Sequence, residues 1–216
     1  QPADLGFGFG FNAFGQRHRA QLGHQPHQVG HDLLLAFAGQ VDAADMCQLA
    51  GELCEGFHVH PFHTVKYLQE VTLPNIGIGL ARSGRQRNDI SLSSSIFVIT
   101  GADAEAIAAS RLAVRSQIAF YASTPSYHSV MEVHGWLDTA EKLGMLAARK
   151  QWQEMAALIT DDMLEVFAVS GAPDELAARI QQRYAGLLDR INYYVPFVPG
   201  QQDAHWRRVA EAFHQA

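Results

Sequence analysis

From residue 45 onward, short segments rich in β-branched and aromatic residues alternate with longer segments whose apolar residues recur every three or four positions. The extended pattern occurs at residues 57–60, 90–100 and 189–196. Strands that alternate with helices are typical of a parallel α/β sheet covered by helices. Because a parallel sheet usually has more than three strands, we predict an incomplete part of a larger barrel.

Several residues mark where the helices begin and end. Asp45 can cap a helix that ends near Gly56, and Thr64 can cap a second helix that extends to residue 83. Pro74 is expected to kink or divide this second helix, because proline has no backbone N–H. Further helices are predicted from Asp103 to about residue 120, over residues 138–148, 151–158 and 160–167, from Pro173 onward, and over residues 203–215.

The composition argues against several classes of protein. The 216 residues carry a net charge of −6, whereas a nucleic-acid-binding face needs a basic patch. No apolar run approaches the roughly 20 residues of a membrane span, and no signal peptide is visible after Gln1. Cys47 and Cys54 would lie about 10 Å apart on one helix, too far for a disulfide. We expect a cytoplasmic protein that binds neither nucleic acid nor a membrane.

The character of the chain changes near residue 45. Residues 1–45 are rich in glycine, glutamine and histidine and contain no lysine, and residues 16–31 show no clear period. We therefore interpret residues 1–45 as an atypical N-terminal segment and residues 46–216 as the α/β portion.

The motif HVHPFH gathers His58, His60 and His63 on an otherwise apolar element. Alternate residues of a strand share a face, so His58 and His60 should point the same way. In (β/α)8 barrels the active site lies at the carboxyl ends of the strands, where this motif falls. The histidines could bind a metal ion, line a pocket for a planar or anionic ligand, or form a hydrogen-bonded structural rim.

The other strand ends argue against the metal site. A metal-dependent barrel hydrolase needs further carboxylates or histidines at those ends. One strand ends in Ile99, Thr100 and Gly101, and another ends at Tyr194 and Val195. Because neither end offers a ligand, we expect no metal.

A second candidate is the turn AFYASTPSYH, which contains Tyr121, Ser123, Thr124 and Tyr127. Its hydroxyl groups could contact a ligand, or they could cap the end of the preceding helix. The pattern by itself favours capping.

Several segments resemble the luciferase-like monooxygenase superfamily, and more narrowly its coenzyme F-420-dependent oxidoreductases: GELCEGFHVHPFHTVKYLQEVTLPNI, SSIFVITG, RSQIAFYASTPSYHSVMEVHGW and DRINYYVPF. The similarity runs from about Met46 to Ala216. It implies the C-terminal part of a (β/α)8 TIM-type barrel that binds F-420, or alternatively FMN, at the carboxyl ends of its strands. It also implies hydride transfer involving a small-molecule substrate. Within this resemblance the cofactor-binding residues are expected to be His58, His60, His63, Tyr121, Ser123 and Thr124.

The chain departs from the family near the expected cofactor phosphate, at residues 43–48. Family members usually carry a Gly-Pro-Arg or Gly-Pro-Lys turn just before the position of Met46, whereas this chain has QVDAAD. The carboxylates of Asp42 and Asp45 would repel a phosphate. The residues upstream are also too few to supply the family's first five strands.

These observations leave three hypotheses. The first is an oxidoreductase whose cofactor site is incomplete, and the second is an inactive fragment that pairs with another chain. An open sheet edge would also favour a homo-oligomer. The third is a metal-dependent barrel hydrolase that uses His58 and His60. The sequence does not identify a catalytic residue.

Overall fold

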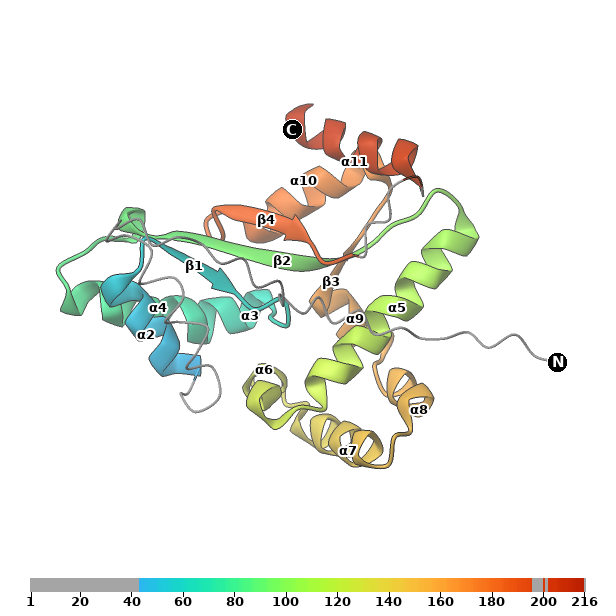
Figure 1. Cartoon of the computed structure of the whole chain (residues 1–216), viewed down its shortest axis with the longest axis horizontal. Helices are drawn as coiled ribbons and strands as arrows, with labels where there is room; N and C mark the ends of the chain where they lie inside the picture. Colours follow the sequence, from blue (N-terminus) through green and yellow to red (C-terminus); the bar gives the residue numbers. More distant parts are fainter. Residues whose placement is uncertain (1–42, 196–199, 201, 216) are drawn as a thin grey trace, which may run out of the picture.

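The structure is a computed structural model that describes residues 43–195, 200 and 202–215. Most of the segment 1–45 therefore lies outside the described residues. The first half of the chain contains α2 (Ala43–Leu53), β1 (Gly56–Val59), α3 (Val65–Tyr67), η1 (Leu68–Thr72), α4 (Leu73–Arg82), η2 (Arg87–Asp89), β2 (Ser91–Ile99) and α5 (Ala104–Ala122) (Figure 1). The second half contains η3 (Pro125–Tyr127), α6 (His128–Glu132), α7 (Leu137–Ala148), α8 (Trp152–Ala157), α9 (Asp161–Phe167), β3 (Ala168–Ser170), α10 (Pro173–Tyr184), β4 (Arg190–Tyr193) and α11 (Asp203–Gln215).

Strand β2 is the centre of the sheet, and its three partners all run parallel to it. Residues 91–94 of β2 pair with β1, residues 93–96 with β4 and residues 97–99 with β3. Because β1 and β4 both pair with β2 at residues 93 and 94, they lie on opposite edges of that strand. The described strands form a parallel sheet that does not close on itself. This confirms the predicted α/β fold with an incomplete barrel.

Strand β3 was not predicted from the sequence. The predicted strands at 57–60, 90–100 and 189–196 correspond to β1, β2 and β4. Strand β3 has three residues and follows α9 without a break, so it shows neither an alternating pattern nor a turn signal. The N–H of Gly171, just after β3, donates to the carbonyl oxygen of Ile99 at 3.2 Å. The short strand therefore extends the pairing of β2 to its carboxyl end.

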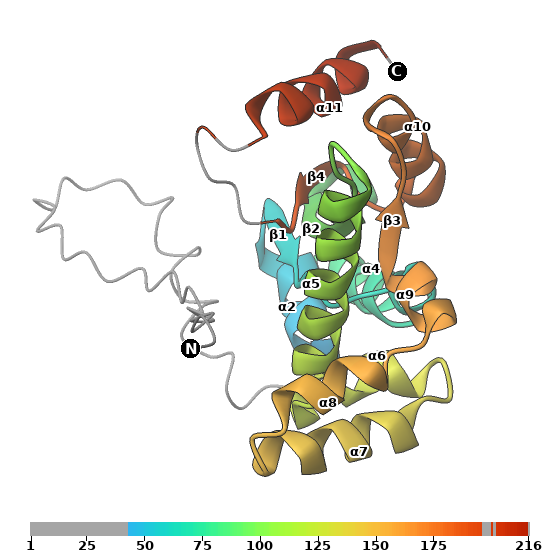
Figure 2. The same cartoon turned by 90° about the vertical axis from the view of Figure 1, so that its right-hand side faces the viewer.

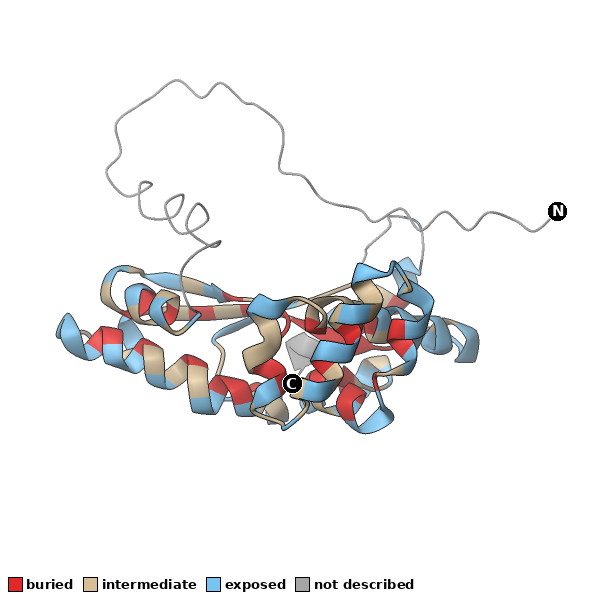
Figure 3. Cartoon of the chain, turned by 90° about the horizontal axis from the view of Figure 1, so that it is seen from below, coloured by how far each residue is buried: buried red, intermediate tan, exposed pale blue. Residues whose placement is uncertain are grey.

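The two faces of β2 have different surroundings. On one face, Leu92 and Val98 are fully buried beneath the layer that contains α2, α4 and α10. On the other face, Phe97 is buried against the helices inserted between β2 and β3. His58 and Asn192, which flank the earlier part of β2 on this second face, are exposed. Figure 3 shows helices along one side of the strands.

Helix α2 differs from the prediction at both ends. It begins at Ala43, so Asp45 lies in its first turn, where a carboxylate favours the helix dipole. It ends at Leu53, and Gly56 is the first residue of β1 and does not terminate the helix. An acidic residue near a helix start suits either the capping position or the first turn, which explains the shift. Cys47 and Cys54 are free thiols, as predicted.

The helix predicted over residues 64–83 is divided next to Pro74, as expected. Thr64 caps α3, and its Oγ1 accepts a hydrogen bond from the N–H of Tyr67 at 3.1 Å. A π-helical segment, η1, follows, and the N–H of Leu73 bonds to the carbonyl oxygen of Leu68, five residues earlier. Pro74 then lies in the first turn of α4. Since proline lacks an N–H, the change of helix type occurs where a regular α-helix would lose a bond.

Helix α5 connects the sheet to the inserted helices. Asp103 caps it as predicted, with Oδ1 accepting from the N–H of Ala106 at 2.8 Å. Helices α6, α7 and α8 gather at the far end of α5 (Figure 2). Asp161, at the start of α9, forms ion pairs with Arg111 and Arg115 of α5. These exposed ion pairs join the start of α9 to α5.

We predict that Gly79→Ala destabilises the protein by about 3 kcal/mol, because a Cβ atom there would lie 1.9 Å from the carbonyl oxygen of Gln48 and would push α4 away from α2. Gly77→Ala on the same helix is the matched control. Its Cβ would meet nothing within 4 Å, and the better helix propensity of alanine should add up to about 1 kcal/mol. Urea unfolding measures both variants, and equal losses of stability would contradict this packing.

Candidate functional site

The loop that follows β1 carries the histidine motif to the carboxyl end of the sheet. Val59, the last residue of β1, is buried in the helix-facing layer. Because side chains alternate along a strand, His58 and His60 point to the opposite face, as predicted. Pro61 cannot continue the strand pairing, and Thr64 starts the next helix. The intervening residues therefore form a short, constrained loop.

His58 lies at the edge of the exposed polar face. Its Nδ1 is 3.0 Å from Oγ of Ser93, which is its register partner on β2. In the described part of the structure, no hydrogen bond or ring contact joins His58 to His60. The two rings therefore have different partners.

His60 lies among tyrosines. Its Nδ1 accepts a hydrogen bond from the N–H of Phe62 at 3.1 Å, and its Nε2 is 3.1 Å from the hydroxyl oxygen of Tyr127. The imidazole stacks on Tyr127 with ring centroids 4.5 Å apart, and it meets Tyr121 edge-on at 4.8 Å. Burial lowers the pKa of His60 to about 4, and nearby His63 and His58 contribute in the same direction. This histidine is therefore neutral at physiological pH.

His63 is a core residue. Its side chain is 2% exposed, and Nδ1 lies 2.8 Å from the carbonyl oxygen of His60, so this nitrogen carries the proton and donates it. Nε2 has no hydrogen-bond partner among the described residues, and the ring meets Tyr184 of α10 edge-on. Burial lowers the pKa of His63 to about 4. The structure thus places His63 beneath the loop, apart from the exposed face.

Tyr121 and Tyr194 bring two distant segments together. Their hydroxyl oxygens are 2.6 Å apart, which joins the last turn of α5 to the residue after β4. Burial is the largest of the causes that raise the pKa of Tyr121, so its hydroxyl stays protonated. Tyr121 also packs edge-on against Tyr127 with ring centroids 5.6 Å apart. We call His60, Tyr121, Tyr127 and Tyr194 the carboxyl-end array.

Ser123 and Thr124 shape the turn between α5 and η3. The Ser123 hydroxyl donates to the carbonyl oxygen of Phe120 at 2.7 Å, which fits the capping role that the sequence pattern favoured. The carbonyl oxygen of Thr124 accepts from the N–H of Tyr127 at 2.9 Å. Together these bonds fix the position of Tyr127 relative to the end of α5.

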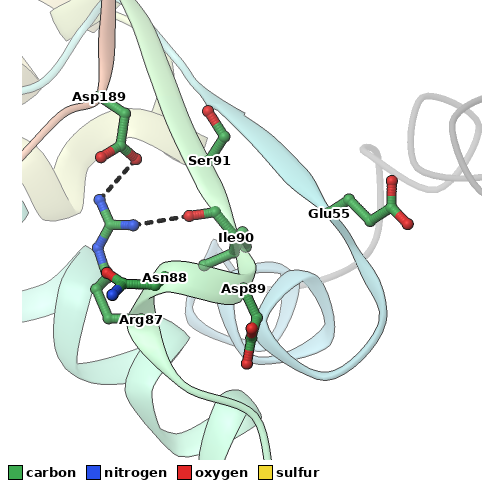
Figure 4. A pocket seen from close by; sticks show the side chains of 7 residues that line it. All are labelled: Glu55, Arg87, Asn88, Asp89, Ile90, Ser91 and Asp189. Atoms are coloured by element: carbon green, nitrogen blue, oxygen red, sulfur yellow. Dashed lines mark hydrogen bonds and ion pairs between the residues drawn. The ribbon is translucent and has the colours of Figure 1, made fainter.

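A separate hollow of about 360 Å³ lies at the amino ends of β2 and β4 (Figure 4). Within it, Arg87 donates to the carboxylate of Asp189 at 2.8 Å and to the carbonyl oxygen of Ile90 at 2.7 Å. Asp189 also accepts from the N–H of Leu92 at 2.7 Å. Arg87 and Asp189 are therefore already paired with each other and with the backbone, and the ion pair joins the amino ends of the strands.

Metal-binding residues do not converge in the described residues. No group of three or more His, Cys, Asp or Glu side chains is placed there to hold an ion. The side chains that contact the His60 ring are tyrosines, Tyr121 and Tyr127. The hydrolase hypothesis therefore gains no support from this part of the chain.

The described residues thus have an α/β fold with a parallel sheet, and polar and aromatic side chains gather at the carboxyl ends of its strands. The profile of the luciferase-like monooxygenase family matches residues 14–190, and the chain belongs to that family. An uncharacterized protein of Mycobacterium tuberculosis is 41% identical over 167 residues, which are 77% of this chain and 48% of that protein. A 5,10-methylenetetrahydromethanopterin reductase of Archaeoglobus fulgidus is 31% identical over 63% of this chain and 41% of its own length.

A solved structure supports the same fold. It is the coenzyme F420-dependent tetrahydromethanopterin reductase of Methanopyrus kandleri, which superimposes with a TM-score of 0.59 at 22% identity. The match covers 80% of this chain and 47% of that reductase. The chain thus spans about half the length of the relatives that it matches.

Two members of the array were not among the residues predicted for the site. Tyr127 belongs to the predicted turn, and its pairing with His60 depends on a contact across 67 positions in the sequence. Tyr194 follows Tyr193, and strand alternation puts these two tyrosines on opposite faces. The register of β4 would have been needed to choose between them.

No helix among the described residues is long and apolar enough to cross a membrane.

We predict that the free energy of unfolding falls as the pH drops from about 6.5 toward 4. The pKa of His63 is about 4 in the folded protein and about 6.5 when unfolded, so the unfolded chain binds more protons in this window. The full difference between the two pKa values corresponds to about 3 kcal/mol in the free energy of unfolding. His63→Gln keeps a donor for the His60 carbonyl group but cannot titrate, so its pH dependence should be weaker.

Urea unfolding at neutral pH and at about pH 5 measures this effect. His58→Gln, which replaces an exposed histidine of the same motif, is the matched control and should retain most of the wild-type pH dependence, because burial is the largest cause of the lowered pKa of His63 and His58 contributes less. An identical pH dependence in His63→Gln and the wild type would show that His63 is not the buried neutral group described here.

Proposed function

We propose that this chain is the C-terminal portion of a coenzyme F-420-dependent oxidoreductase and that it forms one wall of the cofactor and substrate site. The observation that carries the proposal is the carboxyl-end array, which places aromatic rings and hydroxyl groups where parallel α/β folds bind ligands. Membership of the luciferase-like family supports it, as do relatives named methylenetetrahydromethanopterin reductase and a structural neighbour named for coenzyme F420.

In this proposal the predicted residues have different roles. His60 and Tyr121 line the site together with Tyr127. Ser123 and Thr124 hold the turn that carries Tyr127. The remaining two histidines contribute to the same region: His63 supports the loop from the core, and His58 extends the polar face along β1.

The residues fit the ring of F-420 better than its phosphate. The array offers flat aromatic surfaces and hydroxyl groups without a charged side chain, which suits a neutral heterocycle. The expected phosphate region, residues 43–48, coincides with the start of α2, but exposed Asp45 lies in its first turn. When bound, F-420 would supply the hydride chemistry, while this chain would bind and orient the ring and its substrate. FMN, with a similar ring, is the alternative cofactor.

A second candidate is a domain that needs a partner before it is active. Part of one sheet face is exposed, and β1 and β4 lie on opposite edges of the described sheet. The chain also spans about half the length of its relatives. Unpaired strand edges favour association with another chain or with a second copy of this chain.

The free thiols and the family membership of this chain suit a cytoplasmic enzyme that acts on a small molecule.

We predict that the purified chain binds oxidised F-420 saturably, one molecule per chain, with a change in the absorbance of the deazaflavin. FMN is titrated in parallel to compare the two cofactors. Met145→Gln, at a side chain that is exposed on α7, is a control and should bind like the wild type.

Two other outcomes would redirect the proposal. Binding that occurs only after the amino-terminal half of the mycobacterial relative is added would favour the partner-dependent domain. Absence of F-420 and FMN binding under both conditions would contradict the oxidoreductase proposal.

A further inference from the structure

The hydrogen bonds around His60 determine which of its nitrogens carries the proton. The N–H of Phe62 donates to Nδ1 at 3.1 Å, so Nδ1 must present a lone pair. A neutral imidazole with a free lone pair on Nδ1 carries its proton on Nε2. The backbone of the loop thereby fixes the tautomer of His60.

This tautomer makes Tyr127 an acceptor toward His60. The Nε2–H group lies 3.1 Å from the hydroxyl oxygen of Tyr127 and donates to it. The hydroxyl proton of Tyr127 must then point to a different acceptor, because a phenol has one proton. Among the described residues, the hydrogen bond with His60 is the one found for this hydroxyl group, and the tyrosine is half-buried. A half-buried donor in this position is available to a ligand.

The rest of the array gives this donor aromatic surroundings without charge. Tyr121 lies edge-on to Tyr127, and its hydroxyl group is paired with that of Tyr194 at 2.6 Å. Burial lowers the pKa of His60 to about 4 and raises the pKa of the Tyr127 phenol, so both side chains are uncharged at neutral pH. A phosphate or carboxylate would lose hydration here without gaining a cationic partner, whereas a neutral carbonyl group needs a single donor.

We propose that the Tyr127 hydroxyl donates a hydrogen bond to a ring carbonyl of a neutral, planar heterocycle that packs against the carboxyl-end array, and that His60 is the positioning residue that directs this donor. The inference deepens the proposed function, on which it rests, by assigning a residue and a ligand group to the wall of the site. The heterocycle could be a cofactor ring or a substrate ring. An isoalloxazine represents the cofactor ring and a pterin represents the substrate ring. Both carry the required ring carbonyl, so a comparison of their binding distinguishes the two sources.

The test uses the full chain with two neutral probes, lumiflavin and 6-methylpterin, and follows the quenching of their fluorescence. Tyr127→Phe keeps the ring but removes the donor, so the preferred probe should bind about five- to tenfold more weakly. Tyr193→Phe is the matched control, because Tyr193 packs in the helix-facing layer. The affinity of this variant for the probe should stay within about twofold of that of the wild type. Inorganic phosphate in large excess should not compete.

An infrared difference spectrum separates the hydrogen bond from a general effect on structure. The carbonyl stretch of the bound probe should shift to lower frequency in the wild type and return toward its free value in Tyr127→Phe. His60→Gln should partly reverse the shift, since it removes the group that directs the Tyr127 proton. Thermal unfolding of each variant verifies that it is folded.

The inference would be overturned if neither probe bound the wild type, if Tyr127→Phe bound with wild-type affinity, or if phosphate displaced the probe. The outcome is separable from that of the proposed function. F-420 binding by the wild type, together with binding of both probes that is unaffected by Tyr127→Phe, would reject this inference alone. Probe binding that depends on Tyr127, without any binding of F-420, would reject the cofactor assignment alone.

Discussion

Parallel pairing along strand β2 is the constraint on which the rest of the structure depends. Its residues bond to β1 and β4 on opposite edges, and its last three residues also pair with β3. One face of β2 is covered by helices along its length, while the other face is covered at the carboxyl end. Every described strand pairs directly with β2 and runs parallel to it. The carboxyl ends of the strands therefore lie at the same end of the sheet, and side chains from distant parts of the chain gather there.

The chemistry at the carboxyl ends of the strands follows from burial and from backbone hydrogen bonds. In the short loop after β1, the backbone N–H of Phe62 donates a hydrogen bond to His60, and burial keeps the imidazole neutral. The turn held by Ser123 and Thr124 brings Tyr127 to the other ring nitrogen of His60. We propose that a site built in this way recognises shape and hydrogen-bond acceptors more than charge, as one wall of a cofactor site would.

Much of the fold could be predicted from the sequence because its signals are local. Asp103 and Thr64 cap helices as expected, and Pro74 coincides with the break between η1 and α4. β3 was missed because three residues carry no periodicity, and Gly56 was misassigned because a glycine can end a helix or begin a strand. The partners of His60 could not be predicted, since the choice of Tyr127 depends on contacts between segments far apart in the sequence.

The protonation state of His60 is the most direct test of this account. Spectra of ¹⁵N-labelled histidine can report it, with His60→Gln used to assign the signal. The account predicts a neutral ring at neutral pH, with the proton on Nε2, that becomes charged only near pH 4. A charged His60 at neutral pH would contradict the account, because Nδ1 could not then accept the hydrogen bond from the N–H of Phe62. A neutral ring with its proton on Nδ1 would also contradict it, because Nε2 would then accept the Tyr127 proton that the account assigns to a ligand.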